Sequence, residues 1–577
     1  MPYIGIDFGT SNSVVADFQF GRPVVLPNHE GHSATPSVVT MRRDGSLAFG
    51  HEAKENFDED RSIRSIKRVL GSASRVKLLG KELRPEQVAV MLLSLLKRDA
   101  EAVIKEPIQK AVVTVPANSK GLARRATKLC AGAAGLQVLT LINEPTAAAI
   151  CYGLDAQTEQ TILVYDFGGG TLDVTVLRAH HGVFEEVASK GVGKLGGDDL
   201  DAALGSYIAE RFQQKTGYDI LESPQRTPFL LAVERAKIAL SGEAYTVAWA
   251  PGLVPDRQLS LEEPIERLEF ERLIKPFVQQ SGGAIEEALS RCGMTARDVD
   301  RVLLVGGSSK IPYVRSYVAN KLDKEPEPFE KIDPMTCVAQ GAAIVSAILQ
   351  GATGLDHYAY SVKLEHSLCA NPIDERGKSF LDPIIRRGTD IPCSFTKTYY
   401  PVADPAERIV VSVFEGDVYD DPDDTENVKL AEIPWEFDPP RPQHDAGIEV
   451  TYAYDDEGIL TVQIHDPFTQ ARQRYAIQGE TAEPLTPQQM EKMQAINEAL
   501  VQKTAKFEAS PQYRGALDVL NRAERAILPK IVEAHDRADI EAACRSLRQA
   551  MASGDLARMN ELTGSLGDKL LNFAYLL

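Results

Sequence analysis

A short sequence pattern occurs twice in this chain, and no other feature restricts its possible folds as strongly. The first copy, "IGIDFGTSNSVVA", covers residues 4–16, and the second, "VYDFGGGTLDVTV", covers residues 164–176. In each copy an apolar strand ends at an aspartate, Asp7 or Asp166, small and hydroxyl residues follow, and a second apolar strand begins. Two such hairpins predict a duplicated core with two lobes, each presenting one glycine-rich loop.

The residue types in both loops suit phosphate. Glycine lets backbone N–H groups approach phosphate oxygens, and hydroxyl groups add donors. Asp7 and Asp166 stand at strand ends, where they can hold a hydrated Mg²⁺. Either hairpin alone also fits an ordinary turn, but the pair favours a triphosphate gripped from both sides. The loop residues expected to bind it are Gly9, Thr10, Ser11, Asn12, Gly168, Gly169, Gly170 and Thr171.

Two further glycine clusters follow. "VLLVGGSSKIP" (302–312) reads as a buried strand, a Gly-Gly step and a helix, which is a place for a nucleotide's base or sugar. "GVGKLGGDDLD" (191–201) precedes another helix. The P-loop pattern is absent, since its nearest approach at Gly377-Lys378-Ser379 has Pro372 at the first glycine position. Candidate binding residues here are Gly196, Gly197, Gly306, Gly307, Ser308 and Lys310.

The overall charge and the cysteines narrow the class of protein. The formal net charge of −19 argues against nucleic acid or an anionic membrane as the main partner. No apolar run approaches the length of a membrane span, and the N-terminus lacks a secretory pattern. The 7 cysteines include no C-x-x-C pair, which suits a reducing compartment. We therefore expect a cytoplasmic protein.

The predicted secondary structure changes in type twice along the chain. Up to about residue 352, strands such as 111–115, 162–165 and 302–305 alternate with helical patterns such as 88–104, which predicts an α/β domain. From about 365, short alternating runs (408–414, 448–454 and 459–466) predict an antiparallel β domain. From about 485 the pattern is helical, with start signals at Thr486-Pro487 and Ser510-Pro511.

Six segments taken together resemble the ATPase motifs of DnaK-type 70-kDa heat-shock chaperones, in family order. They are "GIDFGTSNS", "INEPTAAAICYGLD", "DFGGGTLD", "LGGDDLD", "ERAKIALS" and "VLLVGGSSKIP". Later, "DPIIRRGTDIP" and "EVTYAYDDEGIL" resemble the family's peptide-binding domain, and "LTPQQMEKM" resembles the start of its helical lid. The fold that the resemblance implies is multidomain: an α/β actin-like two-lobed ATPase (1–352), a linker (353–364), an antiparallel β-sandwich (365–483) and an α-helical lid (484–577).

The resemblance also implies roles for individual residues. Lys67 aligns with the lysine that orients the attacking water, and Glu144 with a carboxylate near metal and water. Thr10 and Thr171 align with threonines at the γ-phosphate. The remaining roles fall on the adenosine pocket (Glu234, Lys237 and Ser241) and the interdomain relay (Pro116 and Arg124).

The resemblance further implies ATP or ADP, Mg²⁺ and K⁺ as cofactors. The expected function is an ATP-dependent chaperone, an ATPase that binds apolar segments of unfolded polypeptides and couples their release to ATP. Its partners would be such peptides, a J-domain co-chaperone and a nucleotide-exchange factor. Two alternatives stay open. One is a weakly or non-hydrolysing, nucleotide-gated regulator or exchange factor for another chaperone. The other is a small-molecule kinase on the same fold, against which the β and helical sections count.

Several positions depart from the family pattern. Ile238 and Lys310 stand where the family places two arginines around adenine, and Met335 replaces a carboxylate. The leucine-rich linker is replaced by "LDHYAYSVKL", in which Tyr358, Tyr360, Val362 and Leu364 alternate with polar or small residues. This period of two predicts a docking strand or the first strand of the β domain. The expected peptide pocket consists of Tyr399, Ile409 and Val411, which core packing alone would also explain.

Overall fold

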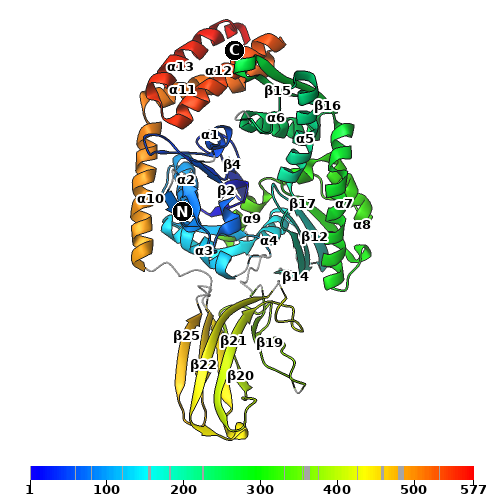
Figure 1. The fold of residues 1–577 in the computed structure, drawn as a ribbon, viewed down its shortest axis with the longest axis vertical. Helices are drawn as coiled ribbons and strands as arrows, with labels where there is room; N and C mark the ends of the chain where they lie inside the picture. The colour runs from blue at the N-terminus through cyan, green and yellow to red at the C-terminus, as the bar shows by residue number, and fades with distance from the viewer. Residues whose placement is uncertain are drawn as a thin grey trace.

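The fold was obtained as a computed structural model (Figure 1). The residues that it describes are 2–58, 60–78, 81–117, 119, 121–153, 158–180, 183–223, 226–330, 332–353, 355, 364, 366–374, 376–424, 427–455, 460–477, 487–531 and 533–576. Within these ranges, no helix is both long enough and apolar enough to cross a membrane.

The duplicated pattern forms two sheets built in the same way. In one, the order is β11-β10-β1-β2-β3, and in the other β17-β12-β13-β14. β1 pairs antiparallel with β2 and parallel with β10, just as β12 pairs with β13 and β17. Both expected hairpins are therefore confirmed. The strands are β1 (Ile4–Asp7), β2 (Asn12–Gln19), β3 (Arg22–Leu26), β10 (Lys110–Val115), β11 (Gln137–Asn143), β12 (Gln160–Phe167), β13 (Leu172–His180), β14 (Val183–Val192) and β17 (Arg301–Val305).

Two helices, α4 (Glu144–Cys151) and α9 (Cys337–Leu349), share one apolar core with strands of both sheets. Their small residues allow very close contact. A Cβ on Gly341 would lie 1.8 Å from the carbonyl oxygen of Ala147, and one on Gly5 would lie 2.1 Å from the backbone nitrogen of Ala343. The alanine- and glycine-rich "EPTAAAIC" and "CVAQGAAIVSAIL" sequences thus join the two sheets.

We call the β1 sheet with its surrounding elements lobe I and the β12 sheet with its surrounding elements lobe II. The helix expected over 88–104 is confirmed and begins three residues earlier, at Pro85. Lobe I contains α1 (Gly50–Glu55), α2 (Pro85–Ile104), α3 (Gly121–Ala133), β4 (Thr35–Pro36), β5 (Val38–Met41), β6 (Leu47–Phe49), β7 (Ser62–Arg64), β8 (Val76–Leu78) and β9 (Lys81–Leu83). Lobe II contains α5 (Gly197–Thr216), α6 (Arg226–Gly242), α7 (Arg267–Arg291), α8 (Pro312–Leu322), β15 (Tyr245–Val254) and β16 (Leu259–Glu266).

The expected antiparallel β region is also present. Its two sheets, β19-β18-β21-β22 and β20-β23-β24-β25, face one another across a common core that includes Trp435 and Tyr452. The strands are β18 (Leu368–Ala370), β19 (Asp382–Ile385), β20 (Cys393–Tyr399), β21 (Ala406–Glu415), β22 (Val428–Arg441), β23 (Ile448–Tyr454), β24 (Leu460–His465) and β25 (Arg472–Ile477).

The C-terminal helices, α10 (Pro487–Glu508), α11 (Pro511–Asn521), α12 (Ala534–Ser553) and α13 (Leu556–Leu571), form what we call the helical segment. The Ser510 start signal is confirmed, because the Ser510 side chain accepts a hydrogen bond from the Tyr513 backbone N–H. The Thr486 cap lies outside the described residues, as do Tyr358, Tyr360 and Val362 of the linker. In Figure 1 the β-sandwich lies at one end of the molecule and α11–α13 at the other, with α10 running beside lobe I.

The helical segment is anchored on lobe I through a buried polar cluster. Arg42 is fully buried, with its guanidinium 4.5 Å from the Phe507 ring centroid. It donates to Glu52 at 2.7 Å, and Glu52 also accepts a 2.8 Å bond from the Tyr513 hydroxyl. Arg42 Nε also donates to the Met551 carbonyl at 3.0 Å. A buried charge is tolerated only when it is paired in this way, so the contact is a specific one.

Candidate functional site

The two repeated hairpin loops meet each other. A Cβ on Gly169 would lie only 2.2 Å from the Ser11 side-chain oxygen, which belongs to the other lobe. Within the first loop, a Cβ on Gly9 would lie 2.0 Å from the Asn12 carbonyl oxygen, so the turn that carries Thr10 closes tightly. Glycine is therefore required where the loops approach each other, and this close approach lets backbone groups of both lobes converge on one ligand.

The other two glycine clusters join the second loop. The Gly197 backbone N–H donates to the Gly168 carbonyl at 3.0 Å, and the Ser308 hydroxyl donates to the same carbonyl at 3.0 Å. A Cβ on Gly196 would lie 2.5 Å from the Gly169 oxygen. Gly306, with φ of +82°, begins the 3-10 turn Gly307–Lys310 that places Ser308. The structure thus brings together four clusters that are far apart in sequence.

Lys67 and Glu144 lie beside these loops. Lys67 is in a 3-10 turn, Ile66–Val69, and its ammonium donates to Glu144 at 2.6 Å. Glu144 is the first residue of α4, and the preceding strand β11 ends at Asn143. Both side chains are largely buried, and the Lys67 ammonium lies 5.9 Å from the Phe8 ring centroid. The pair is therefore held in a low-dielectric site, where the electrostatic interaction of a charge with its neighbours is stronger than in water.

Three partly buried aspartates share this site. Burial and the nearby Glu144 charge raise the pKa of Asp7 to about 7, against the opposing effects of Lys67 and a 2.9 Å hydrogen bond from Thr114. Burial likewise raises the pKa of Asp166, with Glu144, Asp173 and Asp7 adding to the effect. Burial and Glu144 raise the pKa of Asp173 to about 7, although Thr171 donates a hydrogen bond to it. The cluster has more negative charge than Lys67 alone can balance.

Such a cluster fits a divalent cation. Mg²⁺ prefers carboxylate oxygens as protein ligands, and it keeps several of its water ligands when bound. Among the residues that the structure describes, no group of three or more His, Cys, Asp or Glu side chains is arranged to hold a metal directly. The excess of buried carboxylate nevertheless matches a cation held through water at Asp7 and Asp166.

The predicted adenosine residues share one face of α6. Glu234, Lys237, Ile238 and Ser241 follow helical spacing. Glu234 accepts a 2.6 Å bond from Lys54 of lobe I, and Lys237 donates to Asp201 at 2.6 Å and to the Gly197 carbonyl at 3.2 Å. This face of α6 therefore contacts α1 of lobe I through Glu234 and the glycine cluster at Gly197 through Lys237.

The two positions that replace arginines differ in their surroundings. Ile238 is 60% exposed, although it is a large apolar side chain. Lys310 pairs with Asp333 at 2.7 Å, and Asp333 also accepts the Met335 backbone N–H at 2.9 Å. A Cβ on Gly307 would touch the Met335 sulfur at 2.9 Å. An exposed apolar side chain beside a glycine-lined site is available to pack on a flat ring.

Of the two expected relay residues, Arg124 is linked to the β-sandwich through a series of polar contacts. Pro116 follows β10, and its carbonyl accepts the Ser119 N–H at 3.0 Å. Arg124 on α3 donates to the Asn143 side chain at 2.8 Å, and Asn143 in turn donates to Glu186 of β14 at 2.8 Å. Glu186 pairs with Arg387 of the β-sandwich at 3.2 Å. A chain of polar contacts thus runs from the residue preceding Glu144 to the β-sandwich.

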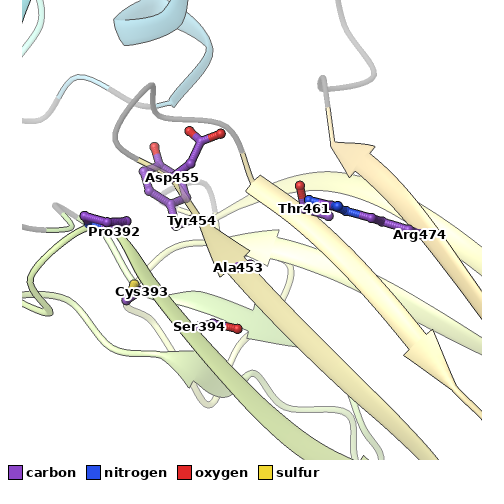
Figure 2. Close-up of a pocket in the computed structure, with 8 residues that line it drawn as sticks. All are labelled: Pro392, Cys393, Ser394, Ala453, Tyr454, Asp455, Thr461 and Arg474. Carbon is purple, nitrogen blue, oxygen red and sulfur yellow. The ribbon is translucent and has the colours of Figure 1, made fainter.

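The predicted peptide residues are placed differently from one another. Val411 lies in the sandwich core, whereas Ile409 and Tyr399 are partly exposed at its border. The Tyr399 hydroxyl donates to Asp382 at 2.8 Å. A separate hollow of about 400 Å³ lies across β20, β23, β24 and β25 and includes none of the three (Figure 2). Its lining residues are Pro392, Cys393, Ser394, Ala453, Tyr454, Asp455, Thr461 and Arg474.

Two site residues were missed by the sequence reasoning. Asp173 pairs with Asp166 across the second hairpin, but the matching position of the first hairpin is Val14, so comparing the two copies concealed it. Arg68 of lobe I reaches the second loop, where a Cβ on Gly170 would coincide with its guanidinium, and it lies 3.9 Å from Asp198. The sequence signal for Arg68 was its position next to Lys67.

Comparison with known proteins agrees with this geometry. A family model described as "Hsp70 protein" matches residues 3–76 and 72–574. "Chaperone protein DnaK" of Methanothermobacter thermautotrophicus is 36% identical over 583 residues, covering 98% of this chain and 94% of that relative. Proteins of the same name from Thermotoga neapolitana and Thermotoga petrophila are 39% and 38% identical over 487 residues, covering 82% of this chain and 80% of each relative.

Proposed function

Because this chain belongs to the Hsp70 family, it is an ATP-dependent molecular chaperone and an ATPase, and we propose that it couples ATP hydrolysis to the capture and release of unfolded polypeptides. The observation that supports this most directly is the meeting of the two glycine loops at Ser11 and Gly169, beside Lys67 and Glu144. Backbone donors from both lobes and one oriented lysine are what phosphoryl transfer to water requires.

In the proposed mechanism, the loop N–H groups and the hydroxyls of Thr10 and Thr171 bind phosphate oxygens. Lys67, held by Glu144, orients a water toward the γ-phosphate. Mg²⁺, when bound, neutralises phosphate charge near Asp7 and Asp166. α6 and the turn Gly307–Lys310 hold the nucleoside. K⁺ stays a prediction from the resemblance.

We propose domain limits of 1–352 for the ATPase, 353–364 for the linker, 365–483 for the peptide-binding domain and 484–577 for the lid. The helical segment is docked on lobe I through Arg42 and Tyr513, away from the partly exposed Tyr399 and Ile409. This arrangement supports a state in which the lid is open and peptide exchanges freely. An extended peptide would lie at the border of the sandwich and bind through its main chain and one apolar side chain.

Coupling would run through Asn143. Asn143 touches Arg124 and Glu186, and Glu186 pairs with Arg387 of the β-sandwich. Asn143 immediately precedes Glu144, which is bonded to Lys67. A shift of the β-sandwich would therefore change the position of Lys67. Leu364 is buried in the sandwich core and exchanges hydrogen bonds with Gly388 and Thr389, which favours the interpretation of the linker end as part of the β domain. A J-domain co-chaperone and an exchange factor are proposed as partners.

The test is the release of a fluorescent apolar peptide from the full chain, followed by stopped flow with and without ATP. We expect ATP to speed release. Ile409→Asp should abolish peptide binding while ATP binding persists, because a charge would enter the apolar contact. Val410→Asp, a change at the exposed neighbour on the opposite face of β21, is the matched control and should bind normally.

Two outcomes would contradict this function. Peptide release that ignores ATP, with hydrolysis intact, would mean that the two activities are not coupled. Phosphate transfer to a small molecule instead of water would favour the kinase alternative.

A further inference from the structure

Helix α12 contacts both lobes at once. On lobe I, Arg548 pairs with Glu55 of α1 at 3.1 Å, and on lobe II, Arg545 donates to the Pro251 carbonyl of β15 at 3.0 Å. The two arginines are three residues apart and so lie on one side of the helix. Figure 1 shows α11, α12 and α13 extending from the end of α10 over α1 to β15.

The elements that α12 connects also touch each other. Lys54 of α1 pairs with Glu234 of α6 at 2.6 Å, and Glu55 of α1 pairs with Arg235 of α6 at 3.5 Å. Glu234 belongs to the predicted adenosine face of α6. Separation of α1 from α6 would therefore open the nucleotide site, and α12 lies across the same junction.

The junction is polar and contains space for water. A cavity of about 290 Å³ lies where α1, α6 and the helical segment meet. Its lining includes Glu55 of α1, Arg235 of α6, and Arg545 and Arg548 of α12. An ion-paired contact is held by directional hydrogen bonds and separates without exposing a large apolar surface. It suits a contact that forms and breaks during a working cycle.

The attachment of α12 to lobe I is firmer than its contact with lobe II. Arg548 lies 3.8 Å from Glu30 of lobe I as well as pairing with Glu55, and the fully buried Arg42 donates to the Met551 carbonyl near the end of α12. On lobe II, within the part of the chain that the structure describes, the hydrogen bond of Arg545 holds α12 to β15. The printed polar contacts therefore hold α12 more extensively to lobe I than to lobe II.

We propose that α12 connects the tips of the two lobes and slows nucleotide release while the helical segment is docked. The helical segment would then act on both of this protein's sites: its departure from lobe I toward the β-sandwich would free α6 and β15 to move away from α1. This inference rests on the proposed nucleotide site, and it assigns to the helical segment a role in controlling that site.

The test measures the dissociation rate of a fluorescent ATP analogue from the full chain after addition of excess ATP. Arg545→Glu places a negative charge beside the Pro251 carbonyl, and we expect release about tenfold faster, since one charge-assisted hydrogen bond is lost. Arg558→Ala is the matched control, because Arg558 pairs with Glu561 within α13 and should leave the rate unchanged.

A second measurement covers the opposite case. The double variant Arg545→Cys with Pro251→Cys, joined by a short reducible bismaleimide, should release the analogue more slowly than the parent protein, and reduction should restore the rate. The two single variants control for the native thiols. Unchanged release in Arg545→Glu, or in the cross-linked protein, would overturn the proposal. Failure of the parent protein to bind the analogue would instead contradict the proposed nucleotide site.

Discussion

The ammonium of Lys67 lies 2.6 Å from a carboxylate oxygen of Glu144, and this pair joins two parts of lobe I that are distant in sequence. Lys67 lies in a short turn after β7, whereas Glu144 begins the helix that packs between the two sheets. Because Glu144 is anchored by α4, it holds the lysine beside the glycine loops. In the proposed mechanism, the pair fixes the positive charge that orients the attacking water.

Replacing Lys67 by alanine should leave ATP binding intact and reduce hydrolysis by roughly 10²–10³-fold, since a single preorganised donor is worth about that much. Single-turnover hydrolysis with enzyme in excess measures this. Lys77→Ala, at an exposed lysine of β8, serves as the control and should hydrolyse ATP at the parent rate. An unchanged hydrolysis rate in Lys67→Ala would show that the pair with Glu144 has a structural role only.

The double change Ile238→Arg with Lys310→Arg should tighten ATP binding. Two guanidinium planes against the base would add cation–π contacts worth about 0.5–2 kcal/mol. Ile238 is exposed and has room for the longer side chain, and Asp333, the present partner of Lys310, would pair equally with a guanidinium. Calorimetric titration with ATP measures the affinity. Weaker binding in the double variant would show that these positions do not face the base.

Arg387→Ala should preserve basal hydrolysis and lose its stimulation by peptide. The change removes the 3.2 Å pair with Glu186, while the loops at Asp7 and Asp166 are untouched. Since coupling between two sites is reciprocal in binding free energy, ATP-driven peptide release should be lost with it. Arg386→Ala, at the exposed neighbouring position, is the control. Normal stimulation of hydrolysis by peptide in Arg387→Ala would show that the pair with Glu186 does not couple the two sites.

Stability should fall as pH rises toward 10. Burial lowers the pKa of His29, but a hydrogen bond to Asp99 and the charges of Asp99, Glu30 and Glu508 outweigh it and raise the pKa to about 9. A raised pKa in the folded state contributes stability that is complete below about 6.5 and is lost as pH rises through about 9. For His29 the contribution is on the order of 3 kcal/mol.

Thermal unfolding between pH 7 and 10 checks this prediction. His29→Gln should be less stable at pH 7 and should show a flatter pH profile. Burial raises the pKa of Glu30 to about 7, so its effect has the same sign but ends at lower pH. His444→Gln, at an exposed histidine, should retain the parent profile. A parallel profile in His29→Gln would assign the pH dependence to other groups.

Much of the fold and of the candidate site could be predicted from local patterns. The repeated hairpins, the α2 helix and the strands of the β region follow from periodicity and turn chemistry, which act over a few residues. The Asp173 carboxylate could not be found in this way, because the first hairpin has Val14 at the matching position. Ile238 and Lys310 could be identified from the sequence as departures from the family pattern, but their exposure and their contacts could not be predicted.

The sequence by itself determined which stretches form strands, loops and helices, and which loops are rich enough in glycine to approach a phosphate, because these depend on backbone sterics and local hydrogen bonding. Only the tertiary structure decided that Gly169 meets Ser11 and that Glu186 pairs with Arg387. It also decided that α12 contacts Glu55 of lobe I and Pro251 of lobe II. Those contacts join segments far apart in the chain, and their geometry is set by how whole lobes and helices pack around shared apolar cores.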